Sequence, residues 1–205
     1  MYLLFAITVA SLIFVYGKND LQLLANHSFY NNGFDWFFYL TTKVVELFSM
    51  FIFLYIIIFR SMKLGAIGVL IYGTTALITK SLKHYIFWQS MRPVFTMKEE
   101  LRLLPDSFEL YEAVQYSFPS GHTTASFTLF CFITIITPQK KWGYLFGFIA
   151  ILVGYSRIYL SQHYFQDILV GATIGTIFTF ILYPIFSKIS LFSWENKSFI
   201  NVLKK

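Results

Sequence analysis

Long apolar stretches constrain this chain more than any other feature of its sequence. Six runs approach the roughly 17–25 residues that a helix needs to cross about 30 Å of hydrocarbon. They are Tyr2–Tyr16, Trp36–Phe59, Leu64–Phe87, Gly121–Pro138, Trp142–Leu160 and Phe165–Phe186. The sequence therefore predicts an all-α fold, a polytopic membrane protein with a bundle of about six transmembrane helices.

The composition also favours a membrane location. Of the 205 residues, 57% are hydrophobic and only 13% are charged, which is more apolar and less charged than a soluble domain. A water-soluble fold with this balance would have too little polar surface to cover itself, whereas a bundle facing lipid needs none on its flanks. Because the chain shows no internal repeat or low-complexity linker, residues 1–205 are expected to form a single domain.

Three segments carry further indications. Tyr2–Tyr16 is short enough for a secretory signal peptide, but it lacks a basic start and a small-residue cleavage site, so a retained helix is favoured. Asn19–Asp35 fits a helix lying in the membrane interface, and an ordinary loop with interfacial aromatic residues fits equally well. Gly171 and Gly175 in the last run would let two helices approach closely.

The basic residues predict the orientation in the membrane. Arg60–Lys63, Pro138–Lys141 and the tail from Ser187 are short or basic, so the positive-inside rule places them in the cytoplasm. The outer side, periplasmic or extracellular in a bacterial cytoplasmic membrane, then receives Gly17–Asp35, Trp88–Ser120 and the turn near Ser161–Tyr164. The formal charge of +6 does not indicate nucleic-acid binding, because Lys and Arg are dispersed in short clusters.

Polar residues are concentrated in three segments at the predicted membrane boundaries. The segments are Lys83–Pro93, Phe118–Ser126 and Ser156–Asp167. On the predicted topology, all three meet on the outer face.

The third segment contains a histidine and a carboxylate at helical spacing. His163 and Asp167 are four residues apart, so on a helix the carboxylate can accept a hydrogen bond from one imidazole nitrogen. The other nitrogen then presents its lone pair, which makes the imidazole a nucleophile or a base. A structural His–Asp pair at a helix end is the alternative for an isolated pair.

The second segment adds an anion site. Ser120 precedes an apolar run and is placed to act as its N-cap, so the free backbone N–H groups there suit an anion. Gly121 removes the side chain that would keep a phosphate oxygen from the backbone. The cations that would complete a cradle for a tetrahedral dianion are Lys83, Arg92 and Arg157.

A zinc site is the alternative use of the same residues. His122, His163 and Asp167 would suffice for an open catalytic zinc site. A divalent cation beside three fixed cations is electrostatically costly, however, unless an anion intervenes. We therefore expect no metal ion and no other cofactor.

The three segments together resemble the signature motifs of the type-2 phosphatidic acid phosphatase superfamily. Pro119-Ser120-Gly121-His122 matches the second motif, and Ser156-Arg157, five residues, His163, three residues and Asp167 match the third. The first motif departs from the usual spacing, because eight residues separate Lys83 from Arg92-Pro93, and Lys80 would be farther still. The resemblance spans roughly Lys83 to Asp167.

The resemblance implies a two-step phosphoryl transfer. His163 attacks phosphorus while Asp167 orients it, and His122 protonates the departing oxygen and then helps water to hydrolyse the phosphohistidine. The residues that it implies for holding the phosphoryl oxygens are Lys83, Arg92, Ser120, Gly121 and Arg157.

The predicted function is hydrolysis of a lipid phosphate or diphosphate on the outer face of the membrane. Undecaprenyl diphosphate, phosphatidylglycerophosphate, phosphatidate and lipid A are all compatible, because the motifs bind only the phosphate. The expected partners are the lipid substrate and the bilayer, with no nucleic acid and no obligate protein partner. The alternatives are a lipid phosphotransferase that uses the same intermediate and a non-catalytic lipid-binding or transport protein.

Overall fold

Helices make up the ordered core of the molecule. The computed structural model describes residues 1–28, 31–102, 114–190 and 196–203. The long helices are α1 (Tyr2–Tyr16), α3 (Asn32–Tyr55), α4 (Met62–Ser81), α6 (Gly121–Ile136), α7 (Trp142–Tyr159) and α8 (Phe165–Ser187). The shorter ones are α2 (Lys18–His27), α5 (Pro93–Thr96) and α9 (Phe199–Leu203). The all-α prediction is confirmed.

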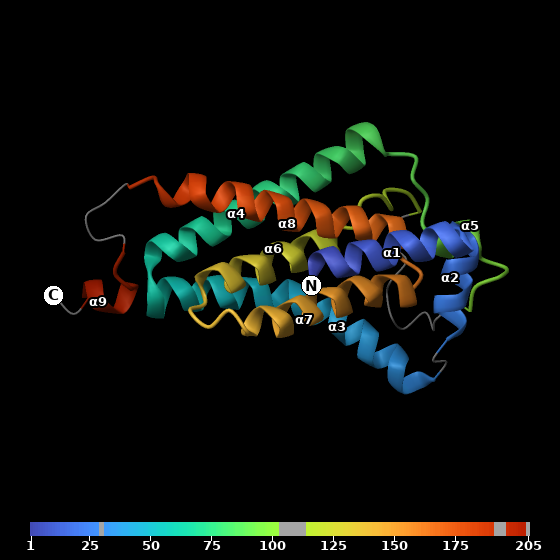
Figure 1. Cartoon of the computed structure of the whole chain (residues 1–205), viewed down its shortest axis with the longest axis horizontal. Helices are drawn as coiled ribbons and strands as arrows, with labels where there is room; N and C mark the ends of the chain where they lie inside the picture. The colour runs from blue at the N-terminus through green and yellow to red at the C-terminus, as the bar shows by residue number, and fades with distance from the viewer. Residues whose placement is uncertain (29–30, 103–113, 191–195, 204–205) are drawn as a thin grey trace.

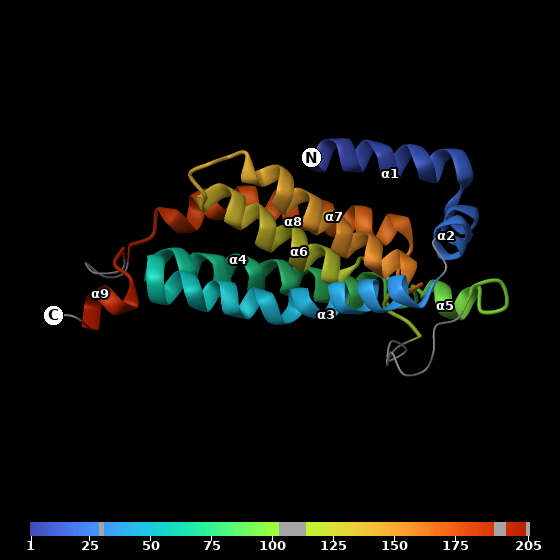
Figure 2. The ribbon, with the colours of Figure 1, turned by 90° about the horizontal axis from the view of Figure 1, so that it is seen from below.

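The long helices form a bundle around α6. Helix α6 packs against α8, α7 and α4, and α1 packs along α8 (Figures 1 and 2). Helices α2 and α5 lie at one end of the bundle, and α9 lies at the opposite end (Figure 1). We call these the α2 end and the α9 end.

The six predicted apolar runs coincide with the six long helices. Two runs continue beyond the regular helix as a π-helical turn, Ile56–Arg60 after α3 and Leu82–Ile86 after α4. By length and hydropathy, two of the described helices are sufficient to cross a membrane, or four if each bent pair is one span. Six long helices are therefore present among the described residues, whereas six membrane spans stay a prediction.

Two glycines bring α8 against α6, as the sequence indicates. A Cβ atom on Gly171 would lie 2.6 Å from the carbonyl oxygen of Ser120, and one on Gly175 would lie 2.6 Å from that of Thr124. No real side chain tolerates such an approach to backbone, so only glycine fits at these positions. The close contact holds the start of α8 beside the start of α6.

Helix α2 resolves one of the open alternatives in the sequence. The chain turns by 106° at Gly17, where φ is +75°, and continues as a helix from Lys18 to His27. Its inner face buries Leu21, Gln22, Ala25 and Asn26. The loop alternative is wrong for this part of the chain, and a position in the lipid interface stays a prediction.

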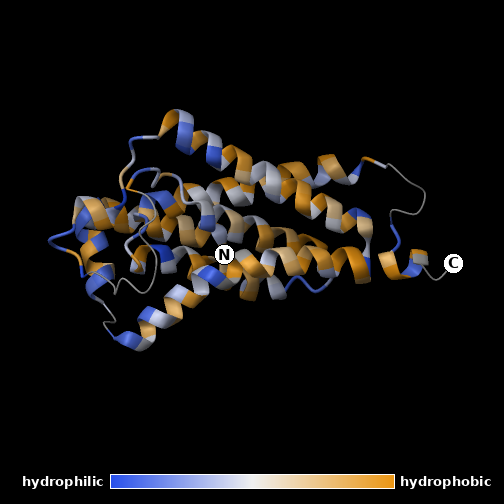
Figure 3. Cartoon of the chain, turned by 180° about the vertical axis from the view of Figure 1, so that it is seen from behind, coloured by the Kyte–Doolittle hydropathy of each residue, from blue (hydrophilic) through white to orange (hydrophobic). Residues whose placement is uncertain are grey.

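The flanks of the bundle are apolar. Large hydrophobic side chains such as Phe48, Phe51, Phe148 and Phe180 are more than half exposed. Figure 3 shows hydrophobic colouring along the long helices and hydrophilic residues collected around the α2 end. This distribution suits a membrane protein, whose flanks face lipid and whose ends face water.

Candidate active site

The three polar segments meet at the α2 end of the bundle. They enclose a cavity of about 300 Å³, which we call the cationic pocket. It is lined by Val45, Tyr72, Lys83, Arg92, Gly121, His122, Ala125, Arg157 and His163. Six of the eight predicted site residues thus face one cavity, and its remaining lining consists of Val45, Tyr72 and Ala125.

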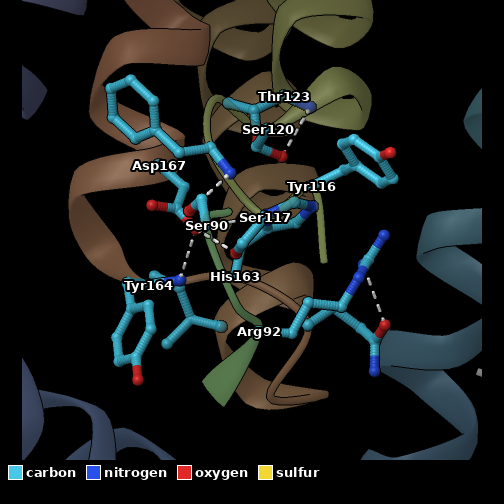
Figure 4. Close-up of polar contacts among 12 residues, drawn as sticks. Ser90, Arg92, Tyr116, Ser117, Ser120, Thr123, His163, Tyr164 and Asp167 are labelled. Atoms are coloured by element: carbon cyan, nitrogen blue, oxygen red, sulfur yellow. Dashed lines mark hydrogen bonds and ion pairs between the residues drawn. The ribbon is translucent and has the colours of Figure 1, made fainter. Parts of the chain in front are cut away.

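His163 and Asp167 are paired, but not in the way that the sequence predicted. His163 lies in the turn between α7 and α8 and not on a helix, because α8 begins only at Phe165. Asp167 stands in the first turn of α8, and its Oδ2 accepts from the N–H of Tyr164 at 3.1 Å. The same oxygen lies 3.4 Å from Nδ1 of His163 (Figure 4). A capping interaction therefore turns the carboxylate toward the histidine.

Ser117 is a third member of this group that sequence reasoning missed. Its hydroxyl donates to Oδ2 of Asp167 at 2.5 Å and lies 3.4 Å from Nδ1 of His163 (Figure 4). All three side chains are almost fully buried. The available signal was position, since Ser117 directly precedes the second polar segment, Phe118–Ser126.

The start of α6 reaches the pocket through Gly121. A Cβ atom built on Gly121 meets nothing within 4 Å, so the main chain there borders open space. Ser120 is the N-cap, as predicted, and its hydroxyl accepts from the hydroxyl of Thr123 at 2.9 Å. Ser120 is fully buried and does not line the pocket. Contact of its side chain with phosphate stays a prediction.

Main-chain bonds hold the second segment to its neighbours. The N–H of Ser120 donates to the carbonyl oxygen of Asp167 at 3.0 Å, and the N–H of Phe118 donates to the hydroxyl of Ser90 at 3.2 Å. These bonds link the second segment to the third and to the first. The N-terminus of α6 and the His163–Asp167 pair are therefore held at a fixed separation.

Lys83, Arg92 and Arg157 reach the pocket from three different elements. Lys83 follows α4 and donates from Nζ to the carbonyl oxygen of Tyr116 at 2.9 Å. Arg92 precedes α5 and donates from Nη1 to Oε1 of Gln162 at 3.1 Å. Arg157, in the last turn of α7, is only 5% exposed.

The longer first motif still delivers its lysine to the pocket. The π-helical turn after α4 carries Lys83, and the chain then returns through Arg92. Lys80, the other lysine considered, is exposed and does not line the pocket. Gln162 went unnoticed in the sequence because an amide gives no chemical signal by itself.

The surroundings of His163 favour the neutral imidazole. Burial, followed by the positive charges of Lys83, Arg157 and Arg92, holds the pKa of His163 well below its usual value. A neutral imidazole keeps the lone pair that a nucleophile needs. With Nδ1 facing Asp167, the nitrogen left for the pocket is Nε2.

The residues weighed as zinc ligands do not form a recognisable metal site. In the described part of the chain, no group of three or more His, Cys, Asp or Glu side chains is arranged to hold a metal ion. The charged and titratable side chains that line the pocket are instead three cations, Lys83, Arg92 and Arg157, and two histidines, His122 and His163. Such a set suits an anion with several oxygens.

The fold and the pocket define a class: all-helical membrane proteins that bring a buried histidine–carboxylate pair to a cationic cavity at one end of the bundle. The sequence model of the PAP2 superfamily matches residues 64–190. The chain belongs to this superfamily.

Several known proteins resemble the chain in sequence or structure. Phosphatidylglycerophosphatase B of Bacillus subtilis is 31% identical over 137 residues, which are 62% of this chain and 61% of the relative. An undecaprenyl-diphosphatase of Sulfolobus acidocaldarius is 30% identical over 123 residues, 60% of this chain and 55% of the relative. The matched regions thus span less than two thirds of these relatives.

The crystal structure of LpxE from Aquifex aeolicus has the same fold. It superposes with a TM-score of 0.70 and 26% identity, covering 82% of this chain and 94% of the solved one. The similarity therefore extends well beyond the motif segments.

Proposed function

We propose that the protein hydrolyses a phosphate or diphosphate group of a membrane lipid through a phosphohistidine on His163. The observation that carries this proposal is the cationic pocket, where a buried His–Asp pair faces two arginines, a lysine and the start of a helix. Membership of the PAP2 superfamily and the names of both relatives support a lipid phosphatase activity.

The first step breaks the bond between phosphorus and the lipid oxygen. Nε2 of His163 attacks phosphorus while Asp167 holds Nδ1–H and stabilises the positive charge that develops on the ring. His122 donates a proton to the departing lipid oxygen. In the second step, His122 takes a proton from water, which attacks the phosphohistidine and releases inorganic phosphate and neutral His163.

The phosphoryl oxygens are held by charge and by main-chain donors. Lys83, Arg92 and Arg157 neutralise the equatorial oxygens, where negative charge spreads in the transition state. The main chain at Gly121 lies at the first turn of α6, where N–H groups point toward an anion. This scheme uses no metal ion, so excess chelator leaves the activity unchanged.

The pocket is proposed to face the outer side of a bacterial cytoplasmic membrane. The basic connections that the positive-inside rule assigns to the cytoplasm are Arg60–Lys63 and Pro138–Lys141. They join α3 to α4 and α6 to α7 away from the α2 end, whereas the pocket lies at the α2 end (Figure 1).

A phosphate-release assay on purified protein tests the proposal. Four substrates in mixed micelles are compared: undecaprenyl diphosphate, phosphatidylglycerophosphate, phosphatidate and lipid A, each with excess EDTA. We expect inorganic phosphate from at least one of them, and the pattern identifies the physiological class. Transfer of phosphate to an acceptor lipid without inorganic phosphate would indicate the phosphotransferase. Inactivity on all four would favour the non-catalytic alternative.

A further inference from the structure

A cluster of buried polar groups lies beside the cationic pocket without lining it. Arg102, in the described part of the outer connection after α5, is at its centre. The main chain of Arg102 pairs with Asn26 of α2: its N–H donates to Oδ1 at 2.8 Å, and Nδ2 donates to its carbonyl oxygen at 3.3 Å. Its guanidinium makes a bidentate ion pair with Asp35 of α3, at 3.0 and 2.5 Å. The Asp35 side chain is only 3% exposed.

Both partners of Arg102 also bind the segment that leads into His163. Nδ2 of Asn26 donates to the hydroxyl of Ser161 at 3.0 Å, and the hydroxyl of Tyr159 donates to Oδ1 of Asp35 at 2.6 Å. Asn26 of α2 and Asp35 of α3, both held by Arg102, thus bind the same three-residue stretch, Tyr159–Ser161.

The Tyr159–Ser161 stretch has a strained backbone conformation that contacts from Asn26 and Asp35 can hold in place. Ser161 has φ of +54°, in the left-handed region that residues with a side chain seldom adopt. Its carbonyl oxygen accepts from the N–H of Val94 at 3.1 Å, and the N–H of His163 donates to the carbonyl oxygen of Arg157 at 3.2 Å. The position of the His163 main chain, from which the ring projects, is therefore set by how this turn is held.

Stability alone does not account for the ion pair. Burying two charges costs desolvation free energy, and well-packed apolar residues in their place are often as stable or more so. A bidentate pair does, however, fix direction and distance better than an apolar contact. The arrangement is therefore suited to positioning.

We propose that Arg102, Asn26 and Asp35 form a clamp that positions His163 for in-line attack on phosphorus. This inference rests on the proposed function, since it takes His163 as the nucleophile. None of the three residues lines the pocket, so they act as positioning residues. Displacing a nucleophile by about 1 Å costs up to roughly 100-fold in rate without changing the groups that bind substrate.

The clamp is tested by steady-state kinetics on variants that remove single contacts. Asp35→Asn keeps the shape of the side chain but removes the charge, and Asn26→Ala removes the amide. We expect each to lower kcat by about 10-fold or more and to leave KM within about twofold, because the phosphate cradle is intact. Tyr159→Phe, which leaves the ion pair in place, should lower kcat less.

Tyr2→Phe is the matched control for Tyr159→Phe. The Tyr2 hydroxyl bonds with that of Thr173 at 2.7 Å, joining α1 to α8 away from the turn. Its removal should leave kcat unchanged. The double variant Asp35→Asn, Arg102→Gln should show a kcat close to that of Asp35→Asn alone, because both changes break one interaction.

Two results would overturn the clamp. One is a folded Asp35→Asn or Asn26→Ala protein whose melting temperature falls while its kcat stays within about twofold of wild type, which indicates a structural role. The other is an equal loss of kcat in Tyr2→Phe and Tyr159→Phe. If Asp35→Asn does not fold, Asn26→Ala and Tyr159→Phe carry the test. Inactivity of the wild-type protein would contradict the proposed function itself, so the two failures are distinguishable.

Discussion

The hydroxyl of Ser117 donates to Oδ2 of Asp167 at 2.5 Å, on the same oxygen that faces Nδ1 of His163. The carboxylate therefore has two fixed donors, Ser117 and the N–H of Tyr164, which leave it little freedom to turn away from the histidine. In the proposed mechanism, Ser117 therefore acts on the reaction through Asp167.

Replacing Ser117 by alanine should slow the reaction. With one donor lost, Asp167 holds the His163 ring less firmly, so we expect kcat to fall by about 10-fold with little change in KM. The measurement is phosphate release at saturating lipid. Ser126→Ala is the control, because the buried hydroxyl of Ser126 donates to the carbonyl oxygen of Thr123 in the same helix, at 3.0 Å. Equal activity of Ser117→Ala and Ser126→Ala would contradict the role of Ser117.

Gly121→Ala should impair phosphate binding without disturbing the fold. The added methyl group meets no protein atom within 4 Å, so it projects into the space proposed for the phosphate. We expect KM to rise by about 10-fold or more, because the phosphoryl oxygens lose their approach to the backbone. The melting temperature should match that of the wild type.

Gly73→Ala is the control for Gly121→Ala. Its Cβ position is also free of contacts within 4 Å, but Gly73 lies on α4 outside the pocket lining. We expect an unchanged KM for Gly73→Ala. Similar KM values for both variants would show that the main chain at Gly121 does not border the phosphate site.

Gly171→Ala should destabilise the protein and reduce its activity together. Its methyl group would lie 2.6 Å from the carbonyl oxygen of Ser120, so α8 must move away from the start of α6. Overpacking of this kind costs about 1–3 kcal/mol. Thermal unfolding in detergent measures the loss, with Gly73→Ala as the reference. A melting temperature equal to the reference would contradict the close packing.

The low pKa of His163 makes stability depend on pH. In the unfolded chain this histidine has a pKa of about 6.5, whereas burial and the neighbouring cations lower it in the folded protein. Between the two pKa values the unfolded state binds more protons, so the free energy of unfolding falls as pH falls below about 6.5. His163→Asn should therefore lose less stability than wild type between pH 7.5 and 5.5. A larger loss in the variant would contradict the neutral imidazole.

The sequence predicted the helices and the pocket well for definite physical reasons. Apolar runs of membrane length leave few alternatives to helices, and the motifs carry chemistry at fixed spacing. Even Lys83, whose spacing is unusual, reaches the pocket. The sequence predicted that His163 and Asp167 pair on one helix. In the structure, His163 lies in the turn before α8, and the capping interaction of Asp167 with Tyr164 brings the two side chains together.

The sequence did not predict the contacts between segments that are distant along the chain. Ser117, Gln162 and Asn26 are ordinary polar residues whose importance appears only when the chain brings them to the turn before α8. Gly121–Ile136 is an apolar helix shorter than a regular span, so the number of six membrane spans stays a prediction.

The most direct test of His163 as the nucleophile is capture of the phosphoenzyme. Wild-type protein is mixed with a lipid substrate that carries a radiolabelled phosphate, quenched in alkaline detergent to preserve phosphohistidine, and separated by electrophoresis. We expect labelled protein for the wild type in excess EDTA and none for His163→Asn, which should also have lost phosphate release. Label that persists in His163→Asn, or near-normal turnover by that variant, would contradict His163 as the nucleophile.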